Sequence, residues 1–328
     1  MKRICSLVLA SLLLIGAVLS FGACKARGSG TYRIGVLQLA QHDALDAATR
    51  GFTDALKAEL GEENVTIDIQ NAAGDNNTCN TIANTFVNKN YDLILANATA
   101  ALQAAAGATM QIPILGTSVT DYATALKLEN FDGTVGGNIS GTSDLAPLDQ
   151  QAQMILDLVP NPNRVGIIYC SAEANSKFQV DTVKAELLRK GLTEDRIKLY
   201  PFSDSNDISS VVKGASAACD VLYVPTDNTA ANATETIYEA MSPKRPLIAG
   251  EESTCKGCGI ATLTISYYDL GYETGKMAVR ILRGEAKIAD MPIAFAPNFT
   301  KKYNARICAE LGITPPAGYE MIAGTERS

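Results

Sequence analysis

Residues 32–60, YRIGVLQLAQHDALDAATRGFTDALKAEL, contain the pattern that decides the fold. Residues 32–39 form a short apolar run, which predicts a buried strand. In residues 43–60 the apolar side chains Ala44, Ala48, Phe52 and Leu56 share one side of a helix. A strand followed at once by an amphipathic helix is typical of a βαβ unit, whose next strand runs parallel to the first.

The same alternation continues along the chain in two similar halves. Further strands are expected at residues 65–71, 91–96, 112–116, 164–169, 197–201, 221–224, 246–249 and 292–295, and further helices at 76–88, 99–109, 147–158, 176–190, 208–217, 229–241, 268–283 and 304–311. The chain is expected to cross between halves near residues 138–141 and again near 249–252. We therefore predict an α/β fold of two Rossmann-like parallel-sheet lobes, with a ligand cleft at the carboxyl ends of the strands.

The N-terminus predicts export and lipid attachment. Lys2 and Arg3 precede the apolar residues 7–21, a length that fits a signal peptide and is short for a spanning helix. The stretch ends at Phe21-Gly22-Ala23-Cys24, which resembles a bacterial lipobox. We expect a signal peptide at residues 1–23, lipidation of Cys24, and a flexible tether at 24–31 on the extracytoplasmic side of the cell membrane. The alternative is an ordinary signal peptide with an incidental cysteine.

Composition and charge narrow the choice of partners. The chain is 47% hydrophobic and 19% charged, with a formal net charge of −7. An acidic surface argues against nucleic acid or anionic lipid as the main partner. The roughly 300 residues after the leader exceed the usual size of one core and favour two domains. No helix-turn-helix pattern precedes the first strand, which counts against a repressor.

The cysteines give no support for metal or redox chemistry. Cys255 and Cys258 have the spacing of a redox pair or of half a zinc site, but His42 is the single histidine of the chain. We place the segment in a loop and expect a local disulfide or two free thiols. The sequence also shows no nucleophile–base pair. We therefore predict a protein that is not an enzyme and has no cofactor.

Polar residues gather at the expected strand ends. His42 follows the first strand, and Thr99 opens a helix whose free N–H groups favour an anion. Asp227 and Asn228 follow a strand of the second half, where they suit an amine and a carboxylate respectively. A structural contact for His42 and helix capping for Asp227 and Asn228 remain open alternatives. Glu251 brings another carboxylate to the expected second crossing.

The chain resembles the solute-binding family of ABC transporters that includes the tryptophan and tyrosine importers' binding proteins. The resemblance covers nearly the whole mature chain. The motifs that carry it are IGV at residues 34–36, HDALD at 42–46, NA at 71–72, GD at 74–75, IPI at 112–114, NISGTSD at 138–144, EANS at 173–176, YVPTDNT at 223–229, YYDLG at 267–271 and TGKMA at 274–278.

The resemblance implies the ribose-binding type of periplasmic-binding fold (type I), with three crossings between lobes and the third near Pro292. The lobes would then be residues 32–140 plus 250–290 and residues 141–249 plus 291–328. It implies a monomer that passes an amino acid, often aromatic, to an ABC permease and its ATPase subunit. The implied ligand residues are His42, Thr99, Ser118, Glu173, Asn175, Ser176, Asp227, Asn228 and Glu251.

Some residues depart from the family pattern. Asp43 stands where the family often has proline, and Glu251 stands where it often has aspartate. Trp is absent from the chain, so an aromatic ligand would have to stack on Tyr, Phe or peptide planes. The alternatives are a solute such as a sugar, or a sensor of the same fold that docks on a membrane receptor.

Overall fold

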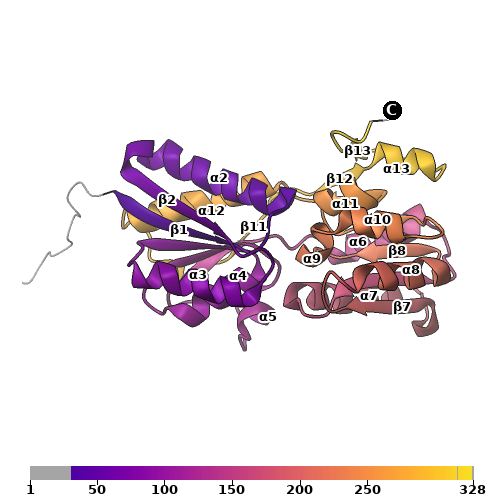
Figure 1. The fold of residues 1–328 in the computed structure, drawn as a ribbon, viewed down its shortest axis with the longest axis horizontal. Coiled ribbons are helices and arrows are strands. Elements are labelled where there is room, and N and C mark those ends of the chain that lie inside the picture. Colours follow the sequence, from indigo (N-terminus) through magenta and orange to yellow (C-terminus); the bar gives the residue numbers. More distant parts are fainter. Residues whose placement is uncertain (1–30, 316, 327–328) are drawn as a thin grey trace, which may run out of the picture. The chain divides into compact units, whose positions relative to one another are not determined.

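The first lobe is built on a parallel sheet with the strand order β11-β5-β4-β3-β1-β2, seen in a computed structural model that describes residues 31–315 and 317–326. Its strands are β1 (Tyr32–Gln38), β2 (Val65–Asn71), β3 (Leu93–Asn97), β4 (Ile114–Val119), β5 (Ile139–Ser143) and β11 (Ala294–Phe295). Its helices are α2 (Asp43–Leu60), α3 (Asn76–Asn88), α4 (Thr99–Ala108), α5 (Tyr122–Leu126) and α12 (Tyr267–Leu282), with short 3-10 turns η1 (Glu62–Asn64) and η3 (Ile288–Asp290). Figure 1 shows α2 and α12 along one face of this sheet and α3 and α4 along the other.

Burial explains why these segments are strands. Every residue of β3 and of β4 is buried, as expected for parallel strands covered by helices on both faces. Leu56 of α2 and Met277 of α12 belong to the core on one face, whereas Phe86 of α3 and Leu102 of α4 belong to the core on the other. The predicted alternation of the first half is confirmed.

The second lobe has a sheet with the strand order β13-β12-β10-β9-β8-β6-β7. Its strands are β6 (Val165–Cys170), β7 (Ile197–Phe202), β8 (Val221–Val224), β9 (Leu247–Ala249), β10 (Ala261–Thr264), β12 (Thr300–Tyr303) and β13 (Glu320–Met321). Its helices are α6 (Leu148–Leu158), α7 (Ala174–Arg189), α8 (Ile208–Ala218), α9 (Asn228–Ala231), α10 (Thr234–Ala240), α11 (Glu252–Cys258) and α13 (Ala305–Glu310), with the 3-10 turn η2 (Glu194–Arg196). The strands from β7 to β10 are parallel, and β12 runs antiparallel to β10. The predicted α/β class with two parallel-sheet lobes is confirmed.

The lobe boundaries differ from the predicted ones. The first crossing is the segment 144–147 between β5 and α6, close to the expected place. The second crossing is at residues 265–266, not at 249–252, because α11 and β10 continue the second sheet beyond β9. The third is at residues 296–299, since β11 still pairs with β5 of the first sheet. Residues 250–264 therefore belong to the second lobe, and 291–295 to the first.

The Cys255–Cys258 segment is a helix, not the predicted loop. It lies within α11, which packs into the core of the second lobe. Both thiols are free and fully buried, so the structure has no disulfide at this pair. Burial raises the pKa of both thiols, and a buried neutral cysteine behaves as a small hydrophobic side chain.

Glycines bring α2 and α12 into close contact. A Cβ atom at Gly271 would lie 1.9 Å from the backbone oxygen of Ala48, and one at Gly51 would lie 2.0 Å from the backbone oxygen of Tyr268. Only glycine permits this backbone approach. This close contact of α2 and α12 at Gly51 and Gly271, called the seam below, fixes the two helices against each other. His42 and Tyr267 lie at the N-termini of the two helices, at the edge of the sheet where the cleft lies.

The predicted signal peptide, the lipidation site Cys24 and nearly all of the tether lie outside the described residues. No helix in the described part of the chain has the length and apolar character needed to cross a membrane.

Candidate functional site

The carboxyl ends of strands from both lobes surround a small inner cavity. Its lining comes from the N-terminus of α2, the ends of β4, β5, β8 and β9, and the start of α12. The lining residues are His42, Ala44, Leu45, Ser118, Thr120, Asp144, Asn175, Thr226, Asp227, Asn228, Ala231, Glu251 and Tyr267. The inner cavity has a volume of about 10 Å³, enough for about one water molecule.

Three side-chain atoms that line the inner cavity are buried without a hydrogen-bond partner. They are His42 Nδ1, Ser118 Oγ and Asp144 Oδ1, half of the six such atoms among the described residues. A buried polar atom without a partner costs roughly 1–3 kcal/mol, so native proteins rarely keep several together. Their convergence on one cavity indicates a site built to receive a polar ligand.

Ser118 is held in an unusual backbone conformation. Its φ angle is +53°, in the left-handed region that non-glycine residues seldom adopt. It lies where the register between β4 and β5 shifts. Such irregularities occur at strand ends next to binding sites, because they re-aim a side chain.

Asp227 caps α9 and also lines the inner cavity. Its Oδ1 accepts a hydrogen bond from Ala230 N at 2.8 Å, and its Oδ2 accepts one from Cys170 N at 2.6 Å. Burial, followed by the negative charge of Glu173, raises the pKa of Asp227 above its ordinary value. The capping alternative is therefore correct for Asp227, and its carboxylate remains at the cavity wall.

Asp144 is the second fully buried aspartate of the inner cavity. Its Oδ2 accepts a hydrogen bond from the Tyr267 hydroxyl at 2.9 Å, whereas its Oδ1 has no partner. Burial raises the pKa of Asp144 to about 6, although hydrogen bonds from Thr120 and Tyr267 oppose that rise. An ammonium group would favour the ionised form of both aspartates.

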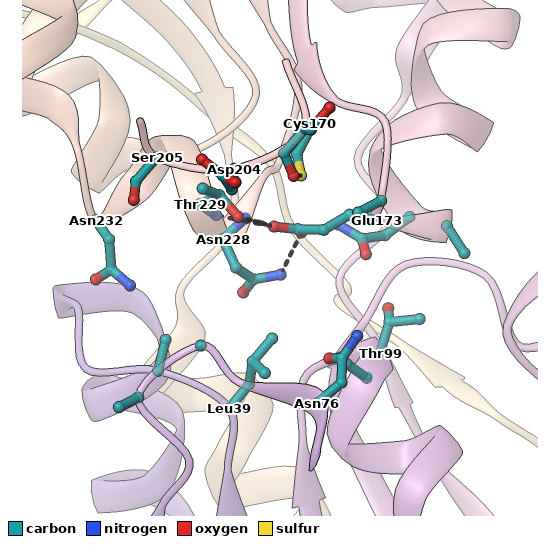
Figure 2. A pocket seen from close by; sticks show the side chains of 18 of the residues that line it. Leu39, Asn76, Thr99, Cys170, Glu173, Asp204, Ser205, Asn228, Thr229 and Asn232 are labelled. Carbon is teal, nitrogen blue, oxygen red and sulfur yellow. Dashed lines mark hydrogen bonds between the residues drawn. The ribbon is translucent and has the colours of Figure 1, made fainter. Parts of the chain in front are cut away.

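Glu173 is occupied by the protein itself. Its carboxylate accepts five hydrogen bonds, from the backbone N–H and side chain of Asn228, from those of Thr229, and from the side chain of Asn175. Figure 2 shows Glu173 directed at Asn228 and Thr229. This arrangement holds Asn228 in place, and its Oδ1 lies 3.4 Å from His42 Nε2 on the other lobe.

An outer cavity of about 440 Å³ adjoins the inner one. In Figure 2 the side chains of Leu39, Asn76 and Thr99 face those of the second lobe across it. Small residues form much of its wall, namely Ala40, Gly74, Ala100, Ala172 and Ala174. The outer cavity shares Asn175 and Asn228 with the inner one.

The structure places the sequence-predicted residues in different positions. Six of them line the inner cavity: His42, Ser118, Asn175, Asp227, Asn228 and Glu251. Thr99 and Glu173 line the outer cavity, whereas Ser176 lies behind Asp227 as a hydrogen-bond partner and lines neither. Glu251 also caps α11 through the backbone N–H groups of Ser253 and Thr254.

Asp144 and Tyr267 were missed as site residues. Both lie in motifs that carried the family resemblance, but neither follows a strand that the sequence pattern made obvious. Asp144 comes directly after β5, and Tyr267 comes three residues after the end of the unpredicted strand β10. The signal that could have found Asp144 is its place at a crossing between lobes. Among the described residues no cluster of potential metal ligands is present.

Comparison with known proteins identifies the family. A family model described as "ABC transporter substrate binding protein" matches residues 33–323. The chain belongs to this family. Its members are transport proteins without enzymatic activity, so the chain is the substrate-binding component of an ABC transporter. The predicted family and the absence of an enzymatic role are confirmed.

Three relatives bear on the site. The tyrosine-binding protein of Clostridioides difficile is 34% identical over 314 residues, which is 89% of this chain and 87% of that protein. An ABC domain from Streptococcus pneumoniae in complex with L-Trp is 35% identical, with a TM-score of 0.83 over 89% of this chain and 100% of that one. The ligand-free, open structure of a substrate-binding protein from Clostridium difficile is also 35% identical, with a TM-score of 0.68 over 89% and 99%. The present chain therefore superposes better on the L-Trp complex than on the ligand-free, open structure.

Proposed function

We propose that this substrate-binding protein takes up a free aromatic amino acid, of the class of L-tryptophan and L-tyrosine, and delivers it to the permease and ATPase of an ABC importer. The observation that carries the proposal is the convergence of three unpartnered buried atoms, on His42, Ser118 and Asp144, on one cavity that also contains Asp227. The relatives that bind tyrosine and L-Trp support the choice of ligand class.

The inner cavity suits the two charges of an amino acid. The carboxylates of Asp144 and Asp227 would accept hydrogen bonds from an α-ammonium group, which carries three donors. The hydroxyl of Ser118 and the ring of His42 would donate to an α-carboxylate. The ligand side chain would extend toward the outer cavity, whose walls of small residues leave room for a planar ring.

The small volume of the inner cavity implies that the lobes separate to admit the ligand. Contacts between the lobes would then form again on closure, among them His42–Asn228 and the ion pair between Lys256 and Asp43 at 3.6 Å. Both members of that ion pair are exposed to solvent, so it contributes little by itself. The differential affinity of the ligand for the closed state would supply the main driving force.

A thermal-shift panel on the mature domain tests the proposed function. At a concentration one hundred times Kd, a ligand adds about 2.7 kcal/mol of stability, which corresponds to an increase of roughly 5 °C in Tm. We expect that increase with L-tryptophan, L-tyrosine or both, and no shift with sugars or short peptides. Stabilisation by sugars or peptides alone would show that the proposed ligand class is wrong.

Ser118→Ala locates the bound ligand. The Ser118 hydroxyl has no partner in the protein, so its removal should not lower the Tm of the ligand-free protein but should weaken amino-acid binding about tenfold. Ser171→Ala is the matched control, because its hydroxyl bonds Phe202 O away from the inner cavity. Equal effects of the two variants on affinity would place the ligand elsewhere.

We also propose that Cys24 carries the lipid and holds the domain on the extracytoplasmic face of the membrane. The support is the apolar leader and the small residues directly before this cysteine. Cells that express the full chain and grow with an alkyne-tagged fatty acid should label it, and Cys24→Ser should abolish the label. Labelling that survives the substitution would contradict the assignment.

A further inference from the structure

The Asp144–Tyr267 pair joins two of the segments that connect the lobes. Asp144 is the first residue of the crossing 144–147, and Tyr267 is the first residue of α12, directly after the crossing 265–266. The hydroxyl of Tyr267 donates to Asp144 Oδ2 at 2.9 Å, and both side chains are buried. The contact lies at the cavity wall, where a ligand would meet it.

The hydrogen bond leaves one oxygen of Asp144 available. Because Tyr267 occupies Oδ2, the unpartnered Oδ1 is the one that remains for another donor. The ring of Tyr267 packs with Ala48, Ile265 and Leu270 in a small apolar cluster, which limits its motion. The hydroxyl therefore acts as a fixed donor that orients the carboxylate.

The surroundings of Asp144 are rich in acidic groups. Asp227 from the start of α9 and Glu251 from the start of α11 share the inner cavity with it, together with the ring of His42 at the start of α2. Tyr122 of α5 also lies near Asp144, and burial and then the charge of Asp144 raise the pKa of its hydroxyl. No lysine or arginine is among the residues that line the inner cavity. The side-chain donors that stabilise the ionised form of Asp144 are thus the hydroxyls of Thr120 and Tyr267.

We propose that Tyr267 is a positioning residue for ligand binding, which holds Asp144 ionised and directs its free oxygen to the α-ammonium group of the ligand. The inference rests on the proposed function, because it assumes that the inner cavity receives an amino acid. It places the charge recognition of the ligand at the crossing segments, where a movement of the lobes would disturb the pair.

The role of Tyr267 predicts a specific dependence on pH. Burial raises the pKa of Asp144 to about 6, and the hydrogen bonds from Thr120 and Tyr267 oppose that rise. Loss of the Tyr267 hydroxyl would raise that pKa further, so Asp144 would become protonated at a higher pH. An ammonium ligand binds the ionised carboxylate, and the variant should therefore lose affinity earlier than the wild type as the pH falls.

Tyr267→Phe tests the proposal, with Tyr268→Phe as a matched control. Tyr268 is the next residue, its hydroxyl also bonds a carboxylate (Asp54 at 3.0 Å), and it is partly exposed outside the inner cavity. Calorimetric titrations of L-tyrosine and L-tryptophan would be run between pH 5.5 and 8.5. We expect Tyr267→Phe to weaken binding about tenfold at pH 7, with a ratio to wild type that grows toward pH 5.5. Tyr268→Phe should match the wild type throughout.

Two further measurements separate positioning from packing. In the Asp144→Asn background, Tyr267→Phe should have little additional effect, because the group through which it acts is already neutral. If Tyr267→Phe folds poorly, Asp144→Asn alone provides the test: it should weaken binding of the amino acid at least about tenfold and leave binding of the amine-free analogue 3-(indol-3-yl)propionate unchanged.

A constant ratio between Tyr267→Phe and wild type across the pH range would overturn the proposal, because a packing defect has no reason to follow the titration of Asp144. Equal losses of Asp144→Asn for the amino acid and for its amine-free analogue would overturn it as well. Failure of the wild type to bind any amino acid would be a different result, since it would remove the proposed function itself.

Discussion

Gly271→Ala should destabilise the first lobe, although alanine is the better helix former. Without a clash the substitution in the middle of α12 would gain roughly 0.5–1 kcal/mol. The new Cβ, however, would lie 1.9 Å from Ala48 O and 2.6 Å from Ala48 C, both of them backbone atoms that cannot rotate away. The helices α2 and α12 would have to separate by about 1 Å, and overpacking of this kind costs roughly 1–3 kcal/mol.

We therefore expect Gly271→Ala to lower the free energy of unfolding by about 1–2 kcal/mol, measured by urea denaturation and supported by a Tm about 2–4 °C lower. Gly107→Ala in α4 and Gly214→Ala in α8 are matched controls. Both glycines are helical and exposed, with no atom within 4 Å of the added Cβ, so they should stabilise the protein slightly. A Gly271→Ala variant as stable as these controls would refute the reasoning about the seam.

The seam also links stability to the site. His42 and Ala44 lie at the N-terminal end of α2, and Tyr267 lies at the N-terminal end of α12. A shift of one helix against the other would change their spacing at the inner cavity. Gly271→Ala should therefore weaken amino-acid binding even at temperatures where the variant is fully folded, while Gly107→Ala and Gly214→Ala should not.

Three further predictions follow from individual side chains. Asp144→Asn should be more stable than wild type at pH 8, because the Asp144 carboxyl is ionised above its raised pKa of about 6 in the folded protein. The difference should narrow as the pH falls below 6 and close only near pH 4, where the same carboxyl, with its ordinary pKa of 3.8, also becomes protonated in the unfolded chain. Urea denaturation at pH 8 and pH 5 measures this, and a gap that is larger at pH 5 would contradict it. Cys255 and Cys258 should resist a thiol reagent in the native protein and react after denaturation, as peptide mass spectrometry can show; a mass lower by two hydrogens would instead indicate a disulfide. Glu173→Gln should lower the free energy of unfolding by about 1–2 kcal/mol in urea, because an amide cannot accept from donors on both of its terminal atoms, and unchanged stability would exclude its role as a cap.

The sequence by itself determined the succession of elements and the class of the fold. Alternating apolar runs and amphipathic helices are local patterns, and they can be recognised in the sequence without any tertiary contact being known. The helix at Asp43–Leu60 and the strand at Val65–Asn71 were predicted with the bounds that the structure shows. The family resemblance added the number of crossings, which periodicity alone does not give.

Short elements and lobe boundaries needed the tertiary structure. The strand β10 has four residues and α11 has seven, and neither is long enough to show a clear period. Their assignment to the second lobe depends on the pairing of β10 with β9 and β12, which is a contact between distant segments. The second crossing was therefore placed too early, and the two cysteines of α11 were mistaken for part of a loop.

The sequence likewise predicted some of the site residues, whereas the contacts of others needed the tertiary structure. The strand-end rule brought His42, Ser118, Asp227 and Asn228 to one edge, because parallel strands present their carboxyl ends together. The sequence could not show that the Glu173 carboxylate accepts hydrogen bonds from the backbone N–H groups at the start of α9, because those donors are more than fifty residues away in the chain. Nor could it show that Asp144 meets Tyr267 across 123 residues of chain. Those distant contacts, which only folding creates, decide which carboxylate remains available to a ligand.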